Sequence, residues 1–147
     1  MAYVTNSDIE VRLGSAAYVQ VTDDNGDGSA DVAVVDEARL GAESEVNSYL
    51  GRRYLAPVDV AQFPETAGVL KSITLDLIEC RLRARRPPVP EEVLQKRDHA
   101  IAWLKGIADG SIAMPTAAEL PLSTARGPIA RASGEPKVLS HDELSGF

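Results

Sequence analysis

The sequence predicts an all-α protein: a small bundle of three long helices plus a short N-terminal helix, with an extended C-terminal arm. Three long segments repeat apolar residues at spacings of three and four, the pattern of one helix face. Proline and glycine interrupt the chain between these segments, and after Gly110 the periodicity is lost. A chain of 147 residues has room for one compact domain. We therefore expect a helical core over residues 1–110 and an arm over residues 111–147.

The first element predicted is a short helix near the N-terminus. Asn6 or Ser7 can cap a helix over residues 8–13, where acidic side chains in the first turn favour the helix dipole. Gly14 is a typical residue to end it. A second turn or two is expected over residues 16–21.

The first long helix is expected from about Val34 to Arg53. Its apolar stripe consists of Val35, Ala38, Ala42, Val46 and Tyr49, widened by Leu40 and Leu50. The third long helix is expected from Glu91 to about Asp109, and Gly110 directly after it is expected to end it. The side chains predicted to face inward there are Leu94, Ile101, Leu104 and Ala108, flanked by Val93, Ala100, Trp103 and Ile107.

The second long helix, from about Glu65 to Arg86, is apolar on most sides. Pro64 suits its first turn, and the proline-rich residues 87–90 stop it. One face carries Leu70, Ile73, Leu77, Cys80 and Ala84, and another carries Leu75, Ile78 and Leu82. Such a helix is either central or shared with a neighbouring subunit. We interpret Cys80 as a small buried hydrophobic residue of a protein made in a reducing cytosol.

The net charge of −7 is concentrated at the front of the chain. Residues 1–60 carry eleven acidic and four basic residues, whereas residues 61–110 carry seven and eight and residues 111–147 carry four and three. A protein that wraps duplex DNA needs clustered Lys and Arg to neutralise phosphates. The distribution therefore argues against a small helical DNA-binding regulator, which a steep salt dependence of DNA affinity would reveal.

An Asp-rich loop over residues 23–31 follows the first helical turns. It fits the first nine positions of an EF-hand calcium loop, with Asp23, Asn25, Asp27 and Asp31 as the candidate metal ligands. The twelfth position, which should be a bidentate Glu, is Val34. Two interpretations stay open: a calcium ion that stiffens the loop, or an Asx-rich turn without an ion.

An arginine cluster, made of Arg81, Arg83, Arg85 and Arg86, is the main basic concentration. It is a candidate partner-binding site for an acidic protein surface or for DNA that passes through a channel. The alternative is a solvated helix end, where the dipole favours cations.

The arm contains proline, glycine and short apolar groups. The groups 120–122 and 138–139, with the terminal Leu144 and Phe147, are spaced like anchors for another chain. The alternative is a solvated tail without a role. Leu144 and Phe147 are our candidate partner-binding residues in the arm.

Motifs of catalysis and of membrane insertion are missing from the sequence. His99 and His141 belong to no metal or hydrolase pattern, and no phosphate-binding glycine loop occurs. No segment has the length of uncharged apolar sequence that a membrane span needs, and no signal peptide is recognised at the N-terminus. We expect a protein that is not an enzyme, needs no cofactor and has no membrane partner.

Residues 35–58 resemble a known family. In this run an acidic helix ends in Tyr49-Leu50 and is followed by Arg53-Tyr54 and Pro57. This pattern is similar to that of the Mu-like prophage proteins assigned to head-tail joining. The similarity extends over roughly residues 3–110, including 70–82 and 89–107, and loops like the Asp-rich loop recur in relatives.

The resemblance implies a helical head-to-tail adaptor of a tailed bacteriophage. Such adaptors form a ring, expected to be dodecameric, beneath the portal protein, and they link it to a downstream neck or tail-completion protein. DNA only passes through the channel. The implied location is the neck of the virion, after assembly in the host cytoplasm. A calcium-dependent helical protein-binding module is the alternative that the Asp-rich loop supports.

Overall fold

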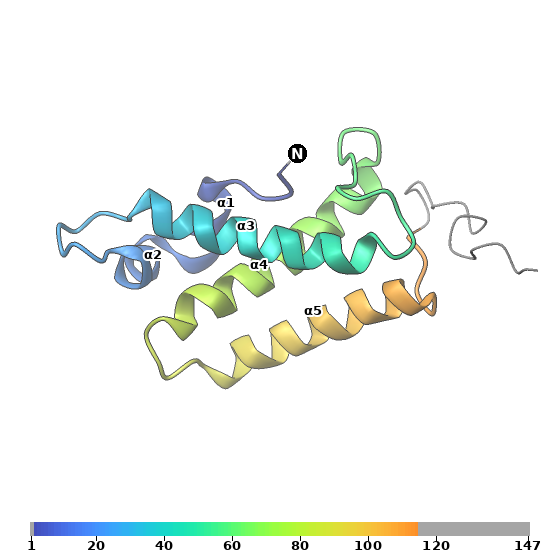
Figure 1. Ribbon diagram of the computed structural model, residues 1–147. Coiled ribbons are helices and arrows are strands. Elements are labelled where there is room, and N and C mark those ends of the chain that lie inside the picture. Colours follow the sequence, from blue (N-terminus) through green and yellow to red (C-terminus); the bar gives the residue numbers. More distant parts are fainter. Residues whose placement is uncertain (1, 115–147) are drawn as a thin grey trace, which may run out of the picture.

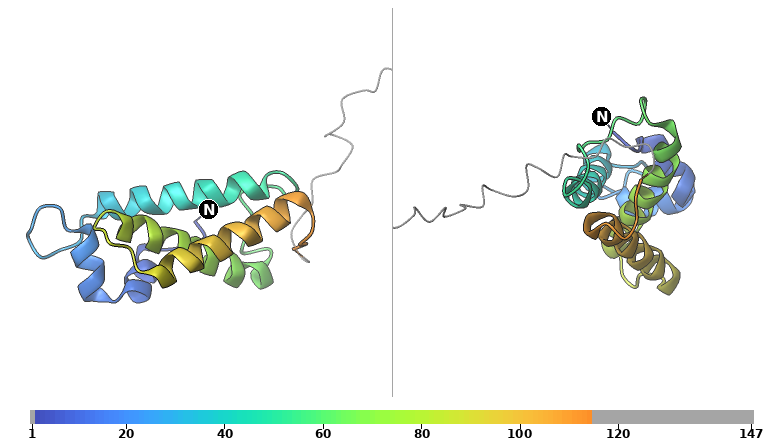
Figure 2. Two further views of the ribbon diagram at one scale, coloured as in Figure 1. Left: turned by 90° about the horizontal axis from the view of Figure 1, so that it is seen from below. Right: turned by 90° about the vertical axis from the view of Figure 1, so that its right-hand side faces the viewer.

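The computed structural model describes residues 2–114, and over this range the protein is all-α, as predicted. The helices are α1 (Asn6–Leu13), α2 (Ser15–Thr22), α3 (Val32–Leu50), α4 (Pro64–Ala84) and α5 (Glu91–Asp109). The three long helices form an elongated bundle, and α1 and α2 pack at the end that carries the loop before α3 (Figures 1 and 2). In the part of the chain described, no helix is long and apolar enough to cross a membrane.

Helix α1 begins at Asn6, two residues earlier than predicted, because Thr5 caps it in place of Asn6 or Ser7. The backbone N–H of Asp8 donates to the Thr5 hydroxyl at 3.2 Å, and the N–H of Thr5 donates to the Asp8 carboxylate at 3.0 Å. This reciprocal pair is a capping box with Asp in place of the usual Glu. Lys71 of α4 also donates to Asp8 at 2.6 Å, so the same carboxylate joins α1 to the central helix.

The contacts of Asp8 predict an acid-dependent part of the stability. The hydrogen bond from Lys71, followed by those from Thr5, lowers the pKa of Asp8 to about 2. A carboxylate with a lowered pKa stabilises the folded chain above its ordinary pKa, and this contribution is lost as the pH falls from about 4 to about 2. We expect Asp8→Asn to lower the free energy of unfolding in urea at pH 7, and we expect the difference from wild type to vanish near pH 2.

The control for this measurement is Glu37→Gln, which removes an exposed carboxylate of α3. It should leave the free energy of unfolding nearly unchanged at both pH values. A difference for Asp8→Asn that stays constant between pH 7 and pH 2 would contradict the assigned role of the carboxylate.

Helix α4 is the centre of the bundle and contacts each of the other four helices of the described region. Its buried apolar side chains are Leu70, Ile73, Leu75, Leu77, Ile78, Cys80 and Leu82. The central position is therefore confirmed, and the chain's own helices account for the many-sided apolarity. The prediction for Cys80 as a buried residue is also confirmed. Ala84, expected on the same face, is exposed because it lies in the last turn, two residues before the predicted end of the helix.

Two predicted apolar stripes were placed slightly off the buried face. In α3, Val35, Ala42, Val46 and Leu50 are buried, but Leu40 is 56% exposed and does not widen the stripe. In α5, the buried side chains are Val93, Ala100, Leu104 and Ile107, whereas Leu94 is 38% exposed. The buried side of α5 thus combines Leu104 of the predicted inward set with Val93, Ala100 and Ile107 of the flanking set, because α3 and α4 both pack against that side of α5.

Helix α3 also ends three residues earlier than predicted, at Leu50. The N–H groups of Arg53 and Tyr54 both donate to the Leu50 carbonyl, at 3.0 and 2.8 Å, and this turn directs Tyr54 into the core. Tyr54 is fully buried.

The segment before α1 is part of the core. The sequence did not indicate this, because the segment is too short to show a periodic pattern. Tyr3 and Val4 are buried, and their backbone N–H groups donate to the Glu43 carboxylate of α3 at 2.9 and 3.4 Å. The Tyr3 hydroxyl donates to Asn47 at 2.6 Å and accepts the N–H of Val58 at 2.9 Å. The front of the chain therefore joins α3 to the connection between α3 and α4.

The chain reverses direction at the end of α5. Gly110 adopts the left-handed conformation predicted for a helix stop, with φ of 90°. The N–H groups of Gly110 and Ile112 both donate to the Gly106 carbonyl, at 3.1 and 2.9 Å. Met114 is buried, and its N–H donates to the Tyr54 hydroxyl at 2.8 Å. Packing with the core therefore continues for the first four residues of the segment that we assigned to the arm.

Candidate functional site

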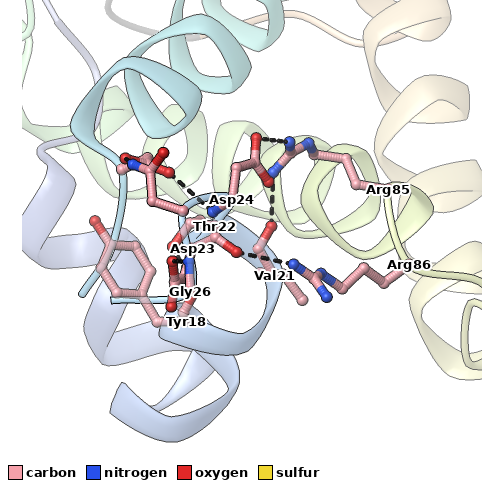
Figure 3. A network of polar contacts seen from close by, with 10 residues as sticks. Tyr18, Val21, Thr22, Asp23, Asp24, Gly26, Arg85 and Arg86 are labelled. Atoms are coloured by element: carbon pink, nitrogen blue, oxygen red, sulfur yellow. Dashed lines mark hydrogen bonds and ion pairs between the residues drawn. The ribbon is translucent and has the colours of Figure 1, made fainter. Parts of the chain in front are cut away.

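The Asp-rich loop connects α2 to α3 and is closed by its own hydrogen bonds (Figure 3). The carboxylate of Asp23 accepts the N–H groups of Gly26 and Gly28, at 2.6 and 2.9 Å. Both glycines have positive φ, which suits them to so tight a turn. Asp31 accepts the backbone N–H of Asp24 at 2.8 Å and the side-chain amide of Asn25 at 2.6 Å.

Asp27 forms a smaller turn of its own within this loop. It accepts the N–H and the hydroxyl of Ser29, at 2.8 and 2.6 Å. These hydrogen bonds, that of the hydroxyl first, lower the pKa of the Asp27 carboxyl. Three of the four candidate calcium ligands thus act as acceptors within the loop, and the fourth, Asn25, acts as a donor.

The described residues of the loop do not form a preformed metal site. Over residues 2–114, no group of three or more His, Cys, Asp or Glu side chains is placed so that it could hold a metal ion. A calcium ion at Asp23, Asn25, Asp27 and Asp31 would bind side-chain oxygens, several of which already accept hydrogen bonds within the loop. Calcium binding stays a prediction, and the observed geometry is that of an Asx-rich turn.

Chelation separates these two interpretations. Because the loop is closed by hydrogen bonds within the chain, we expect excess EGTA to leave the thermal unfolding midpoint unchanged. Titration with Ca²⁺ after exhaustive chelation should likewise leave it unchanged. A midpoint that falls with EGTA and recovers with Ca²⁺, but not with Mg²⁺, would favour the calcium-dependent binding module.

Two residues of the arginine cluster fasten the loop to the end of α4 (Figure 3). The Arg85 guanidinium donates to the Val21 carbonyl at 2.8 Å and to the Asp24 carboxylate at 2.6 Å. Arg86 donates to the Asp23 carbonyl at 2.9 Å. The loop and α4 lie far apart in the sequence, and this contact was absent from both interpretations of the cluster.

The other two arginines pair with acidic side chains of neighbouring helices or turns. Arg81 donates to Glu45 of α3 at 2.8 Å, and Arg83 donates at 2.9 Å to the buried Glu79, one helical turn before it. All four arginines therefore have acceptors inside the chain. Their role toward a partner protein or DNA stays a prediction.

Removing one of the loop contacts should loosen the loop without unfolding the protein. Arg85→Gln removes the ion pair with Asp24, and exposed pairs of this kind are worth at most about 1 kcal/mol. We expect a nearly unchanged melting midpoint but faster cleavage of the Asp-rich loop by a protease specific for acidic residues. The matched control is Arg97→Gln, which removes an exposed ion pair on α5 with Asp98. Equal cleavage rates in the two variants would contradict the fastening role of Arg85.

A groove between α4 and α5 is a second candidate site, which the sequence did not indicate. It has a volume of about 470 Å³, and residues that line it include Val69, Ile73, Asp76, His99, Ala100 and Trp103. A smaller hollow of about 140 Å³ shares Val69 and Trp103 with it and reaches Met114. The pattern on each helix taken separately gave no signal, because the groove exists only where the two helices meet.

The remaining candidate residues, Leu144 and Phe147, lie outside the described residues, as does His141. Their predicted contacts with a partner stay predictions.

The fold and these sites define the class of protein: a small all-α protein with an arginine-fastened acidic loop at one end and an apolar groove along its side. Residues 3–131 match the family described as Bacteriophage Mu, Gp36. The chain belongs to this family and is a protein of a Mu-like bacteriophage. No curated protein sequence matches the chain.

Proposed function

We propose that this chain is a structural head-to-tail adaptor that forms a homo-oligomeric ring beneath the portal of a Mu-like phage. The ring, expected to be a dodecamer, links the portal protein to a downstream neck or tail-completion protein. In this proposal the protein resides in the neck of the virion after assembly in the host cytoplasm, and it is neither an enzyme nor dependent on a cofactor.

The observation that carries the proposal is the extent of the family match. It spans the helical core and continues to residue 131, well beyond residue 114, where the described part of the chain ends. A family pattern that includes the start of the arm suggests that the arm is as much a part of the protein's role as the core. A compact core with a long arm suits a subunit that holds on to neighbours.

The distribution of surface side chains supports the same role. Val11, Val32, Leu40 and Leu55 are each more than half exposed on the described part of the chain. Residues of this kind are candidates for burial between adjacent subunits. Since the buried face of α4 is covered within one chain, we assign ring contacts to these outer side chains and to the arm.

The charge of the chain supports a passive role toward DNA. The acidic front of the chain does not favour the binding of phosphates, and the four clustered arginines are engaged with acceptors of the chain itself. DNA is therefore proposed to pass the ring without specific recognition.

Native mass spectrometry and electron microscopy of the purified neck test this proposal. We expect the chain in a closed ring that stays associated with the portal protein when the head is opened. A chain that is absent from purified virions, or that is monomeric in the presence of the portal at concentrations that occur during assembly, would refute it.

A further inference from the structure

The α4–α5 groove has an apolar floor that the described chain leaves open. Val69 on α4 is 45% exposed, and Trp103 on α5 is partly exposed beside it. Ile73 and Ala100 form the bottom of the groove. Gly68 widens it, because a side chain added at this position would meet no atom within 4 Å. An apolar groove of this size fits a short extended segment of chain.

The chain itself leads into this groove. The smaller hollow, which shares Val69 and Trp103 with the groove, is closed at its far side by Ala113 and Met114. Met114 is held in place by its hydrogen bond to Tyr54, so the described chain ends at the hollow that adjoins the groove. The next residues are Pro-Thr-Ala-Ala-Glu-Leu-Pro-Leu, and Leu120 and Leu122 are the first large apolar side chains among them.

The distances allow this segment to reach the whole groove. Six residues of extended chain from Met114 to Leu120 span about 20 Å. The groove from Trp103 to Lys96 follows α5 for about 10 Å. The charges also agree, since Lys96 and His99 line the far part of the groove and Glu119 is the charged residue of segment 115–122. The acidic side chain that also lines the groove, Asp76, is paired with Arg12 of α1.

We propose that residues 116–122 of the same chain lie in the α4–α5 groove, with Leu120 and Leu122 packed against Val69 and Trp103. A segment tethered at the rim of its site has a high effective concentration, so weak apolar contacts suffice to hold it. The contact would fix the first part of the arm along the core and leave the later residues to engage a partner. This inference does not depend on ring formation or on the portal.

Trp103 is the only tryptophan of the chain and reports on the groove directly. In the full-length protein, we expect the double variant Leu120→Asp/Leu122→Asp to shift the Trp103 emission to longer wavelength and to raise its quenching by acrylamide. The matched control is Leu139→Asp, which adds a charge farther along the arm and should leave both signals as in wild type. Equal spectra for wild type and the double variant would overturn the proposal.

Dilution decides which copy of the chain supplies the segment. If its own chain protects Trp103, the quenching by acrylamide should not change with protein concentration. Sedimentation of the same samples shows the oligomeric state at each concentration. Protection that is lost on dilution would mean that a second copy occupies the groove, and it would overturn the proposal in its present form.

A variant on the groove side gives an independent test. Gly68 lines the groove and an added Cβ there would meet no atom within 4 Å, so we expect Gly68→Leu to be accommodated and to displace the segment. Chymotrypsin should then cleave after Leu122 faster than in wild type, while the thermal midpoint of the helical core stays the same or rises, since Leu favours helix over Gly. An unchanged rate of cleavage would count against the proposal.

Discussion

Leu77→Asp is expected to unfold the protein. Leu77 is 2% exposed at the middle of α4, the helix that contacts all the other helices of the described region. Loss of a buried leucine side chain alone costs about 2–5 kcal/mol, and an unpaired carboxylate in its place adds a desolvation cost of several kcal/mol more. Domains of this size are stable by about 5–15 kcal/mol. We therefore expect the helical circular dichroism signal and the cooperative melting transition to be lost.

A matched substitution on the surface shows whether the loss of stability comes from the buried position or from the change of Leu to Asp itself. Leu94→Asp makes the same change at a side chain that is 38% exposed on α5, and it should melt nearly like wild type. Leu77→Ala provides an intermediate case, with a lowered but cooperative transition. If Leu77→Asp melted like wild type, the central position of α4 would be incorrect.

Ending the chain after Met114 is expected to abolish head-tail joining while the helices remain folded. The cut keeps Ile112 and Met114, which pack on the core, and it keeps the hydrogen bond to Tyr54. Under the proposed function, the removed residues hold the neighbouring proteins of the neck. We expect infectious titre to fall to the level of a phage that lacks the gene, and electron microscopy to show separate heads and tails.

Substitutions in the full-length chain refine this test. Leu144→Asp/Phe147→Asp places charges on the two terminal anchors and should also reduce joining, whereas Ser145→Asp adds a charge between them and should not. A truncated chain that supports normal infection would contradict the role of the arm. A truncated chain that loses its helical signal would instead show that the arm stabilises the core.

Most of the helical architecture could be predicted from local patterns. Capping residues, proline and glycine mark helix ends within a few residues, so α5 was predicted with its observed bounds and the loop before α3 was recognised from its Asx and Gly content. The phase of a helix is harder to predict, since neighbouring stripes on α5 are both apolar. Only the position of α3 and α4 in space decides that Val93 is buried and Leu94 is exposed.

The candidate sites were predicted less well, because they depend on contacts between distant segments. The residues of the arginine cluster were identified. The acceptors of Arg85 and Arg86 in the Asp-rich loop were not, because they lie about 60 positions away in the sequence. Tyr3 and Glu43 carry no periodic signal for their pairing, which joins residues 40 positions apart. The groove required two helices to be placed side by side before it could be seen.

The turn after α5 brings Ser111 and Ile112 back against Gly106. A Cβ at this position would lie 2.7 Å from the Cδ1 atom of Ile112 and 3.1 Å from the Ser111 hydroxyl, so any side chain here would collide with the Ile112 side chain. A methyl group at residue 106 would force the Ile112 side chain to leave its present place against the core. The absence of a side chain at Gly106 thereby lets residues 111–114 pack closely on the last turn of α5 and bring Ile112 and Met114 onto the core.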